Sequence, residues 1–152
     1  MEIFDNFVLW TTLLSWGIAQ VFKVIITLIV DRKFSFERLL GDGGMPSSHS
    51  ATVSCLAILI GWYVGFDSVM FALAAVFAVV VMHDASGVRR ETGKQALSIK
   101  ELANAVNELF VNKDEHIKTE KLKVLVGHTP LQVFFGALLG ITVSIVHILI
   151  FG

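Results

Sequence analysis

The segment Gly127–Phe151, GHTPLQVFFGALLGITVSIVHILIF, joins a short polar motif to a long apolar run. Thr129 is of a type that caps helices and Pro130 suits a first helical position, so the segment predicts a helix over 131–151. About 20 apolar helical residues cross the hydrocarbon core of a bilayer. Backbone groups in lipid must be hydrogen-bonded internally, which also favours a helix. We therefore predict a membrane-spanning helix with His128 at its mouth.

Three other apolar stretches precede this one, at about 7–30, 51–66 and 68–82. The 152-residue chain is 55% hydrophobic, and its mean hydropathy of +0.73 exceeds that of ordinary soluble domains. The two short middle stretches are interpreted as a helical hairpin that turns at Gly65-Phe66-Asp67; one long helix of a soluble bundle is the alternative. The predicted fold is a single all-α integral membrane domain, residues 1–152, with four transmembrane helices.

A polar excursion, residues 85–130, separates the third and fourth predicted spans. Within it, Ser98-Ile99-Lys100-Glu101 has the pattern of a capping box with Ser98 as the N-cap. Apolar residues recur at helical spacing after this motif, from Ile99 to Phe110. We predict one amphipathic helix in this loop, lying on the membrane or across the site. Packing of that helix against the bundle is the alternative.

Basic residues are distributed unevenly along the chain. Of the 12 Lys and Arg residues, Lys23 lies inside the first span, and all the others fall in segments 31–50 and 85–130. The positive-inside rule therefore predicts that this face is cytoplasmic. A phosphate-binding face would be basic in either orientation, so the outer face remains an alternative. The N-terminus has no basic region typical of a cleaved signal peptide, and the single Cys55 is expected to be a packed thiol.

Two histidine motifs precede two of the predicted helices. One is Gly43–Ala51, GGMPSSHSA, and the other contains His128. Two spans separate His49 from His128, so both lie on the same face of the membrane. A helix start attracts anions through its N–H groups and dipole, and histidine exchanges protons near neutral pH. We interpret the pair as one phosphate site; two interfacial histidines without a catalytic role are the alternative.

These motifs resemble signatures of the type 2 phosphatidic acid phosphatase superfamily, which includes the vanadium haloperoxidases, and specifically of its small divergent branch. The segment Pro46–His49 matches the Pro-Ser-Gly-His signature, with Ser48 in place of glycine. The segment Gly127–Gly140 follows the helical half of a second signature. There, His128 occupies the histidine position and Gln132 stands where aspartate is expected.

The resemblance implies a division of labour between the two histidines. His128 would be the nucleophile and form a phosphohistidine, while His49 would protonate the leaving lipid alkoxide. The backbone around Ser47 and Ser48 would hold phosphate oxygens. This division is chemically reasonable, because an attacking imidazole must be neutral at its reactive nitrogen while its partner carries a proton. Neither a metal nor a cofactor is expected.

Phosphoryl transfer also needs cations that stabilise the developing charge. The resemblance suggests Lys23 for this role, with Arg32 nine positions later. That spacing is longer than the family's, and the family's proline does not follow Arg32. A lysine inside a span is costly unless it faces a polar cavity or snorkels to the surface. Snorkelling is the alternative interpretation.

Two departures from the family pattern leave charges to be supplied from elsewhere. Gln132 can orient His128 by a hydrogen bond but carries no charge, and Leu122 stands where arginine is expected. We hypothesise that residues 83–96 contribute the missing groups. In that segment, Arg89 or Arg90 would bind phosphate with Lys94 nearby, and Asp84 would pair with a histidine or an arginine. Interfacial basic anchors with one salt bridge are the alternative, and His83 beside Asp84 is only a weak metal signal.

The predicted function is that of a metal-independent membrane phosphatase acting on lipid phosphates. A cytoplasmic site favours phosphatidylglycerol phosphate or phosphatidate, and the reverse orientation favours undecaprenyl pyrophosphate. Two other classes remain open: a non-catalytic protein that binds lipid headgroups or a partner, and a small transport or assembly subunit. The expected partners are a lipid phosphate and the membrane, with no nucleic acid. A homodimer is also expected, because four helices are few to enclose a lipid site.

Overall fold

The structure, a computed structural model, describes residues 3–31, 44–109 and 127–152. Every regular element in these residues is a helix, which confirms the all-α class there. Arg32 lies outside the described residues. The elements are the short 3-10 helix η1 (Ile3–Asp5), α1 (Phe7–Asp31), α3 (Ser48–Val64), α4 (Val69–Ser86), α5 (Val88–Leu109) and α6 (Pro130–Phe151).

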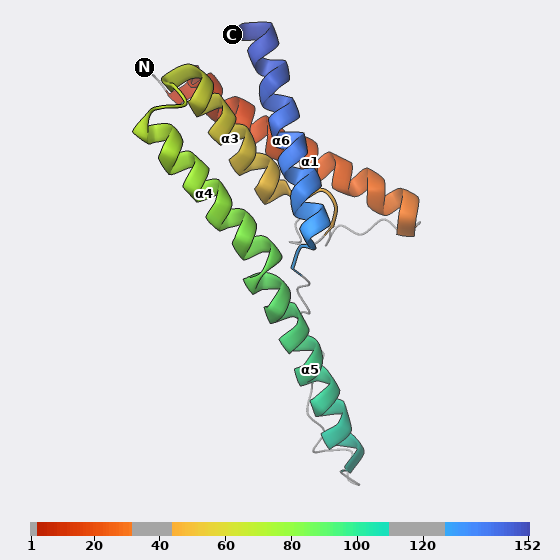
Figure 1. Cartoon of the computed structure of the whole chain (residues 1–152). Helices are drawn as coiled ribbons and strands as arrows, with labels where there is room; N and C mark the ends of the chain where they lie inside the picture. Colours follow the sequence, from red (N-terminus) through yellow and green to blue (C-terminus); the bar gives the residue numbers. More distant parts are fainter. Residues whose placement is uncertain (1–2, 32–43, 110–126) are drawn as a thin grey trace.

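Helix α3 is the centre of the bundle, because α1, α4 and α6 all pack against it (Figure 1). Gly65 ends α3 with a φ of 112°, a value that favours glycine. Ser68 then caps α4 by accepting a hydrogen bond from the Phe71 N–H at 3.1 Å. The predicted hairpin turn at 65–67 is therefore confirmed. It folds α4 back along α3.

The bundle has small residues inside and large apolar residues outside. Ala51, Ala74 and Ala78 are buried, whereas Val69 is 76% exposed and Leu149 is 80% exposed. This distribution suits lipid, where helices associate through close packing of small side chains rather than through a hydrophobic driving force. In the described residues, α1, α6 and a helical stretch that begins with α4 are long and apolar enough to cross a membrane.

Helix α3 is shorter than the other apolar helices. Its 17 residues correspond to about 26 Å, compared with about 30 Å for the hydrocarbon core of a bilayer. The total of four spanning helices therefore remains a prediction.

Two glycines allow α6 to lie directly against α3. A Cβ at Gly136 would overlap the carbonyl oxygen of Ser47, and a Cβ at Gly140 would overlap that of Ala51. Glycines four residues apart permit this close approach of two helices in a membrane. The Ser47 N–H also donates to the Gln132 carbonyl at 3.0 Å. The starts of α3 and α6, which carry the two histidine motifs, are consequently joined backbone to backbone.

The predicted helix start at Ser98 is wrong. Helix α5 begins ten residues earlier, and Ser98 lies in its interior. Hydrogen bonds continue across the junction with α4, from the Gly87 N–H to the His83 carbonyl at 2.8 Å and from the Glu91 N–H to the Gly87 carbonyl at 3.0 Å. The chain therefore needs no new cap at Ser98. Helix α5 extends in roughly the same direction as α4 and leads away from the other helices (Figure 1). The placement of α5 on the membrane therefore stays a prediction.

Candidate active site

The two histidine motifs meet at the end of the bundle opposite the two chain termini (Figure 1). The ring centroids of His49 and His128 are 6.0 Å apart, and the ring planes are inclined by 62°. His128 is 1% exposed, and its backbone N–H donates to the Ala85 carbonyl at 3.1 Å. The end of α4 thus holds the backbone of His128 in place, and the predicted pairing of the histidines is present.

Gln132 holds both the start of α6 and the ring of His128. Its side-chain Oε1 accepts a hydrogen bond from the Thr129 backbone N–H at 3.0 Å. The backbone N–H of Gln132 donates to the Thr129 Oγ1 at 3.4 Å, which completes a capping box. The same Oε1 lies 3.3 Å from His128 Nδ1. An amide oxygen can only accept, so this contact favours a proton on Nδ1 and a lone pair on Nε2. The ring of His128 is thereby oriented with Nε2 turned away from Gln132.

Ser47 is the N-cap of α3. Its Oγ accepts hydrogen bonds from the Ser50 N–H at 3.3 Å and the Ser50 hydroxyl at 3.0 Å. The backbone N–H of Ser47 donates to the Gln132 carbonyl, as described above. The phosphate role predicted for this segment therefore rests on the backbone amides of Ser48 and His49. Ser48 is 2% exposed, and His49, the second residue of α3, is half-buried.

Lys23 is buried beneath the segment that leads into α3. Its side chain is 2% exposed, and it packs against Gly44, where an added Cβ would lie 3.0 Å from the Lys23 Cγ. Gly44 also has a φ of 107°, so a larger residue would be both strained and crowded there. A lysine this deeply buried does not snorkel to the surface. It requires a polar or anionic partner in its surroundings.

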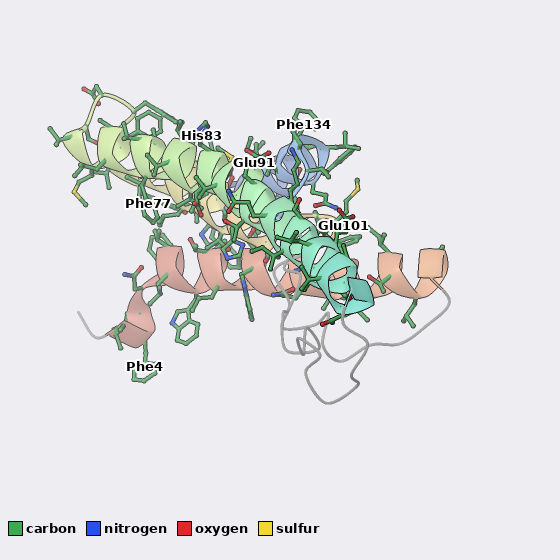
Figure 2. All side chains as sticks on the ribbon, turned by 90° about the horizontal axis from the view of Figure 1, so that it is seen from below. Phe4, Phe77, His83, Glu91, Glu101 and Phe134 are labelled. Atoms are coloured by element: carbon green, nitrogen blue, oxygen red, sulfur yellow. The ribbon has the colours of Figure 1, made fainter. Side chains whose placement is uncertain are left out.

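The predicted phosphate-binding residues of α5 are Arg89, Arg90 and Lys94. Lys94 is exposed and pairs with Glu91 at 2.6 Å on the outer surface of the helix (Figure 2 labels Glu91). Arg89 and Arg90 lie in the first turn of α5, and their side chains are outside the described part of the structure. The phosphate role suggested for these three residues therefore stays a prediction.

Asp84 lies in the last turn of α4, next to Ala85, which contacts the His128 backbone. The predicted pairing of Asp84 with a histidine or an arginine is untested. Among the described residues, no group of three or more His, Cys, Asp or Glu side chains could hold a metal ion.

Thr129 is expected as a cap and Gln132 as a group that orients His128, but two features of the site are missing from the predictions: the capping box that these two residues form together, and the contact of Ala85 with His128. Thr129 and Gln132 fit the Thr-x-x-Gln pattern of a capping box, and this signal could have been read directly from the sequence. Ala85 acts through its backbone carbonyl, and a backbone contact of this kind leaves no signature in residue type. The role of Ala85 could therefore be found only from the structure.

Comparisons with known proteins identify relatives of this chain. Residues 4–143 match the model of the family described as the Divergent PAP2 family. The chain is also 46% identical over 153 aligned positions to the uncharacterized membrane protein YuiD of Bacillus subtilis (strain 168), with 96% of each chain covered. No solved structure matches the chain. The apolar helices and this relative identify an integral membrane protein, and the chain belongs to the Divergent PAP2 family.

Proposed function

We propose that this protein is a phosphatase that acts on a lipid phosphate through a phosphohistidine intermediate. The observation that carries the proposal is the pairing of a buried, oriented imidazole with a second, half-buried imidazole 6.0 Å away. Gln132 favours the lone pair on Nε2 of His128, as a nucleophile requires. His49 is then the partner that carries a proton.

The proposed reaction has two steps. In the first, His128 Nε2 attacks phosphorus, the bond from phosphorus to the lipid oxygen breaks, and His49 gives its proton to that oxygen. In the second, water attacks the phosphohistidine, His49 takes a proton from the water, and inorganic phosphate leaves His128. Lys23 and the N-terminal ends of α3 and α6 stabilise the negative charge on the phosphoryl oxygens.

The substrate proposed is phosphatidylglycerol phosphate or phosphatidate, with the site on the cytoplasmic face. The positive-inside rule supports this orientation, because the histidine end of the bundle leads into the basic segments of the sequence. Undecaprenyl pyrophosphate is the substrate to expect if the orientation is reversed. A homodimer would help the four helices to enclose a lipid, and cross-linking in native membranes tests that part of the proposal.

The direct test is inorganic phosphate release by the purified protein in detergent, with the three lipids offered separately. We expect release from one of them to persist in EDTA, since the proposed chemistry uses no metal. Release that EDTA abolishes would contradict the metal-independent mechanism. The uncharged Gln132 favours a second candidate, a protein that binds lipid headgroups without hydrolysing them. Saturable binding of a lipid phosphate without any release would support that candidate instead.

Replacing Gln132 tests whether its amide oxygen orients His128. In Gln132→Leu, both hydrogen bonds to Oε1 are lost, and we expect phosphate release to fall by roughly 10- to 100-fold, as for a lost positioning contact of a reactive group. Gln132→Glu keeps an acceptor for Thr129 and His128, so it should retain activity well above that of the leucine variant. Equal rates for the two variants would show that the contact does not matter for turnover.

Lys23 offers a test of the buried cation. We expect Lys23→Met, which keeps most of the side-chain volume, to lower phosphate release by about 100-fold, in the range found when a transition-state donor is removed. Lys100→Met is the matched control, because Lys100 is exposed on α5. A comparable fall in both variants would assign the effect to overall charge rather than to the position of Lys23. Circular dichroism of each variant checks that the helices are intact.

A further inference from the structure

One side of α3 is left half-exposed from its first turn almost to its end. His49, Thr52, Leu56 and Ile60 follow one another at intervals of three or four residues, so they lie on one side of the helix. All four are half-buried, whereas most of the remaining positions between them are buried. The Thr52 hydroxyl donates to the Ser48 carbonyl at 2.7 Å. Its polar group is therefore satisfied within the helix, and the side is apolar beyond His49.

The other sides of α3 are occupied by the neighbouring helices. Helix α6 lies over Ser47 and Ala51, α1 contacts Ala51 through Ser15 at 3.2 Å, and α4 contacts Ser54 through the Met82 sulfur at 3.9 Å. The half-exposed side therefore faces the space between α1 and α4. Figure 2 shows these two helices on opposite sides of the bundle, with Phe77 projecting from α4 on the side of α1.

His49 lies at the N-terminal end of this apolar side, and the proposed reaction requires a lipid chain to start there. In-line displacement places the leaving oxygen opposite the attacking nitrogen. His128 is buried on the α6 side, and His49 protonates the leaving oxygen. The lipid part of the substrate must then continue from His49, away from His128. The apolar side of α3 begins at that point.

The length of this side also fits a hydrocarbon chain. The rise from His49 to Ile60 is about 16 Å. One leaflet of a bilayer is about 15 Å deep, half of the roughly 30 Å core. A chain that starts at His49 would therefore reach the middle of the membrane alongside Ile60.

We infer that Thr52, Leu56 and Ile60 of α3 form the binding surface for the hydrocarbon chain of a lipid phosphate whose phosphate lies between the histidines. This inference rests on the proposed function, because the phosphate anchors the chain. The surface selects a lipid by its chain, while the histidines and Lys23 recognise the phosphate. A water-soluble phosphomonoester therefore lacks part of the binding contacts available to a lipid.

Photolabelling of the wild-type protein in nanodiscs tests the inference without relying on turnover. Two probes carry the same diazirine acyl chain, one on phosphatidate and one on phosphatidylcholine, and mass spectrometry locates the adducts. Ile58 supplies the internal control: it is also half-buried and lies at the same depth, but on the opposite side of α3. We expect the ratio of adducts at Leu56 and Ile60 to adducts at Ile58 to be at least about fivefold higher with phosphatidate, the difference a selectively held chain should produce.

Equal ratios for the two probes would mean that bulk lipid covers this side, and the inference would fail. Absence of adducts at Leu56 and Ile60 with both probes, with Ile58 labelled, would mean that protein covers it, and the inference would fail as well. Phosphate release is measured on the same samples. Enriched labelling without phosphate release would support the chain-binding surface and contradict the phosphatase proposal. Phosphate release without enriched labelling would support the phosphatase proposal and contradict the chain-binding surface.

Discussion

Replacing His128 with alanine is expected to abolish phosphate release, with a loss of roughly 10³-fold or more, because the step that forms the covalent intermediate has no nucleophile. The ring of His128 is 1% exposed, and Gln132 contacts it at Nδ1. A substituted side chain cannot reproduce a lone pair at the position of Nε2. The loss should therefore be the largest of any single replacement in the site.

The measurement is phosphate release together with trapping of an acid-labile phosphoenzyme from a ³²P-labelled lipid. His147→Gln is the control, since His147 lies in the other half of α6, where its Nδ1 is 2.9 Å from the Thr11 hydroxyl. We expect this variant to keep the wild-type rate. A His128→Ala protein that still forms the phosphoenzyme would rule out His128 as the nucleophile.

His49 can be separated from His128 by the choice of leaving group. An aryl phosphate has a stable leaving group that needs little protonation, whereas a lipid alkoxide needs a proton. The His49→Ala variant should therefore lose far more activity on the lipid than on the aryl phosphate, and His128→Ala should lose both. Equal losses on the two substrates in His49→Ala would contradict the role of His49 as the acid.

The second large effect is expected at the contact between α3 and α6. A Cβ at Gly140 would overlap the Ala51 carbonyl, which belongs to the backbone of α3 and cannot rotate away. Gly140→Ala should therefore lower the free energy of unfolding by about 1–3 kcal/mol, the range for overpacking, and Gly140→Leu by more. The helices must move apart to admit the side chain. That movement would also shift His128 relative to His49.

Gly17→Ala is the matched control for this prediction. Gly17 lies within α1, and a Cβ there meets nothing within 4 Å. Alanine in a helix interior is favoured over glycine by about 1 kcal/mol, so this variant should be as stable as the wild type or more stable. Unfolding in detergent, followed by tryptophan fluorescence, gives the comparison. If Gly140→Ala proved as stable as Gly17→Ala, the close contact between α3 and α6 would be refuted.

The features that the sequence predicted well are those with local causes. Apolar runs mark the helices because lipid leaves the backbone few other options. Thr129 and Ser47 cap helices through bonds to residues three positions away. The meeting of His49 with His128 was predicted from the two spans expected between them, since an even number of crossings returns the chain to the same face.

The features that the sequence missed depend on contacts between distant segments. Ser98 has a local capping pattern, but continuation of the helix through Gly87 overrides it. The contact of Ala85 with His128 is between backbone atoms, which every residue type carries. The left-handed conformation of Gly44 above Lys23 depends on the path of the chain into α3. No motif in the sequence distinguishes Gly44 from its neighbour Gly43 in this respect.

The side-chain oxygen of Gln132 constrains how this position can change in evolution. The Oε1 atom accepts the capping hydrogen bond at the start of α6 and also orients the ring of His128. A substitution at this position therefore alters both the cap of α6 and the contact that orients the ring of His128. The first turn of α6 must also be folded before the imidazole is oriented. Folding of this turn and orientation of the imidazole are thus a single event at this residue.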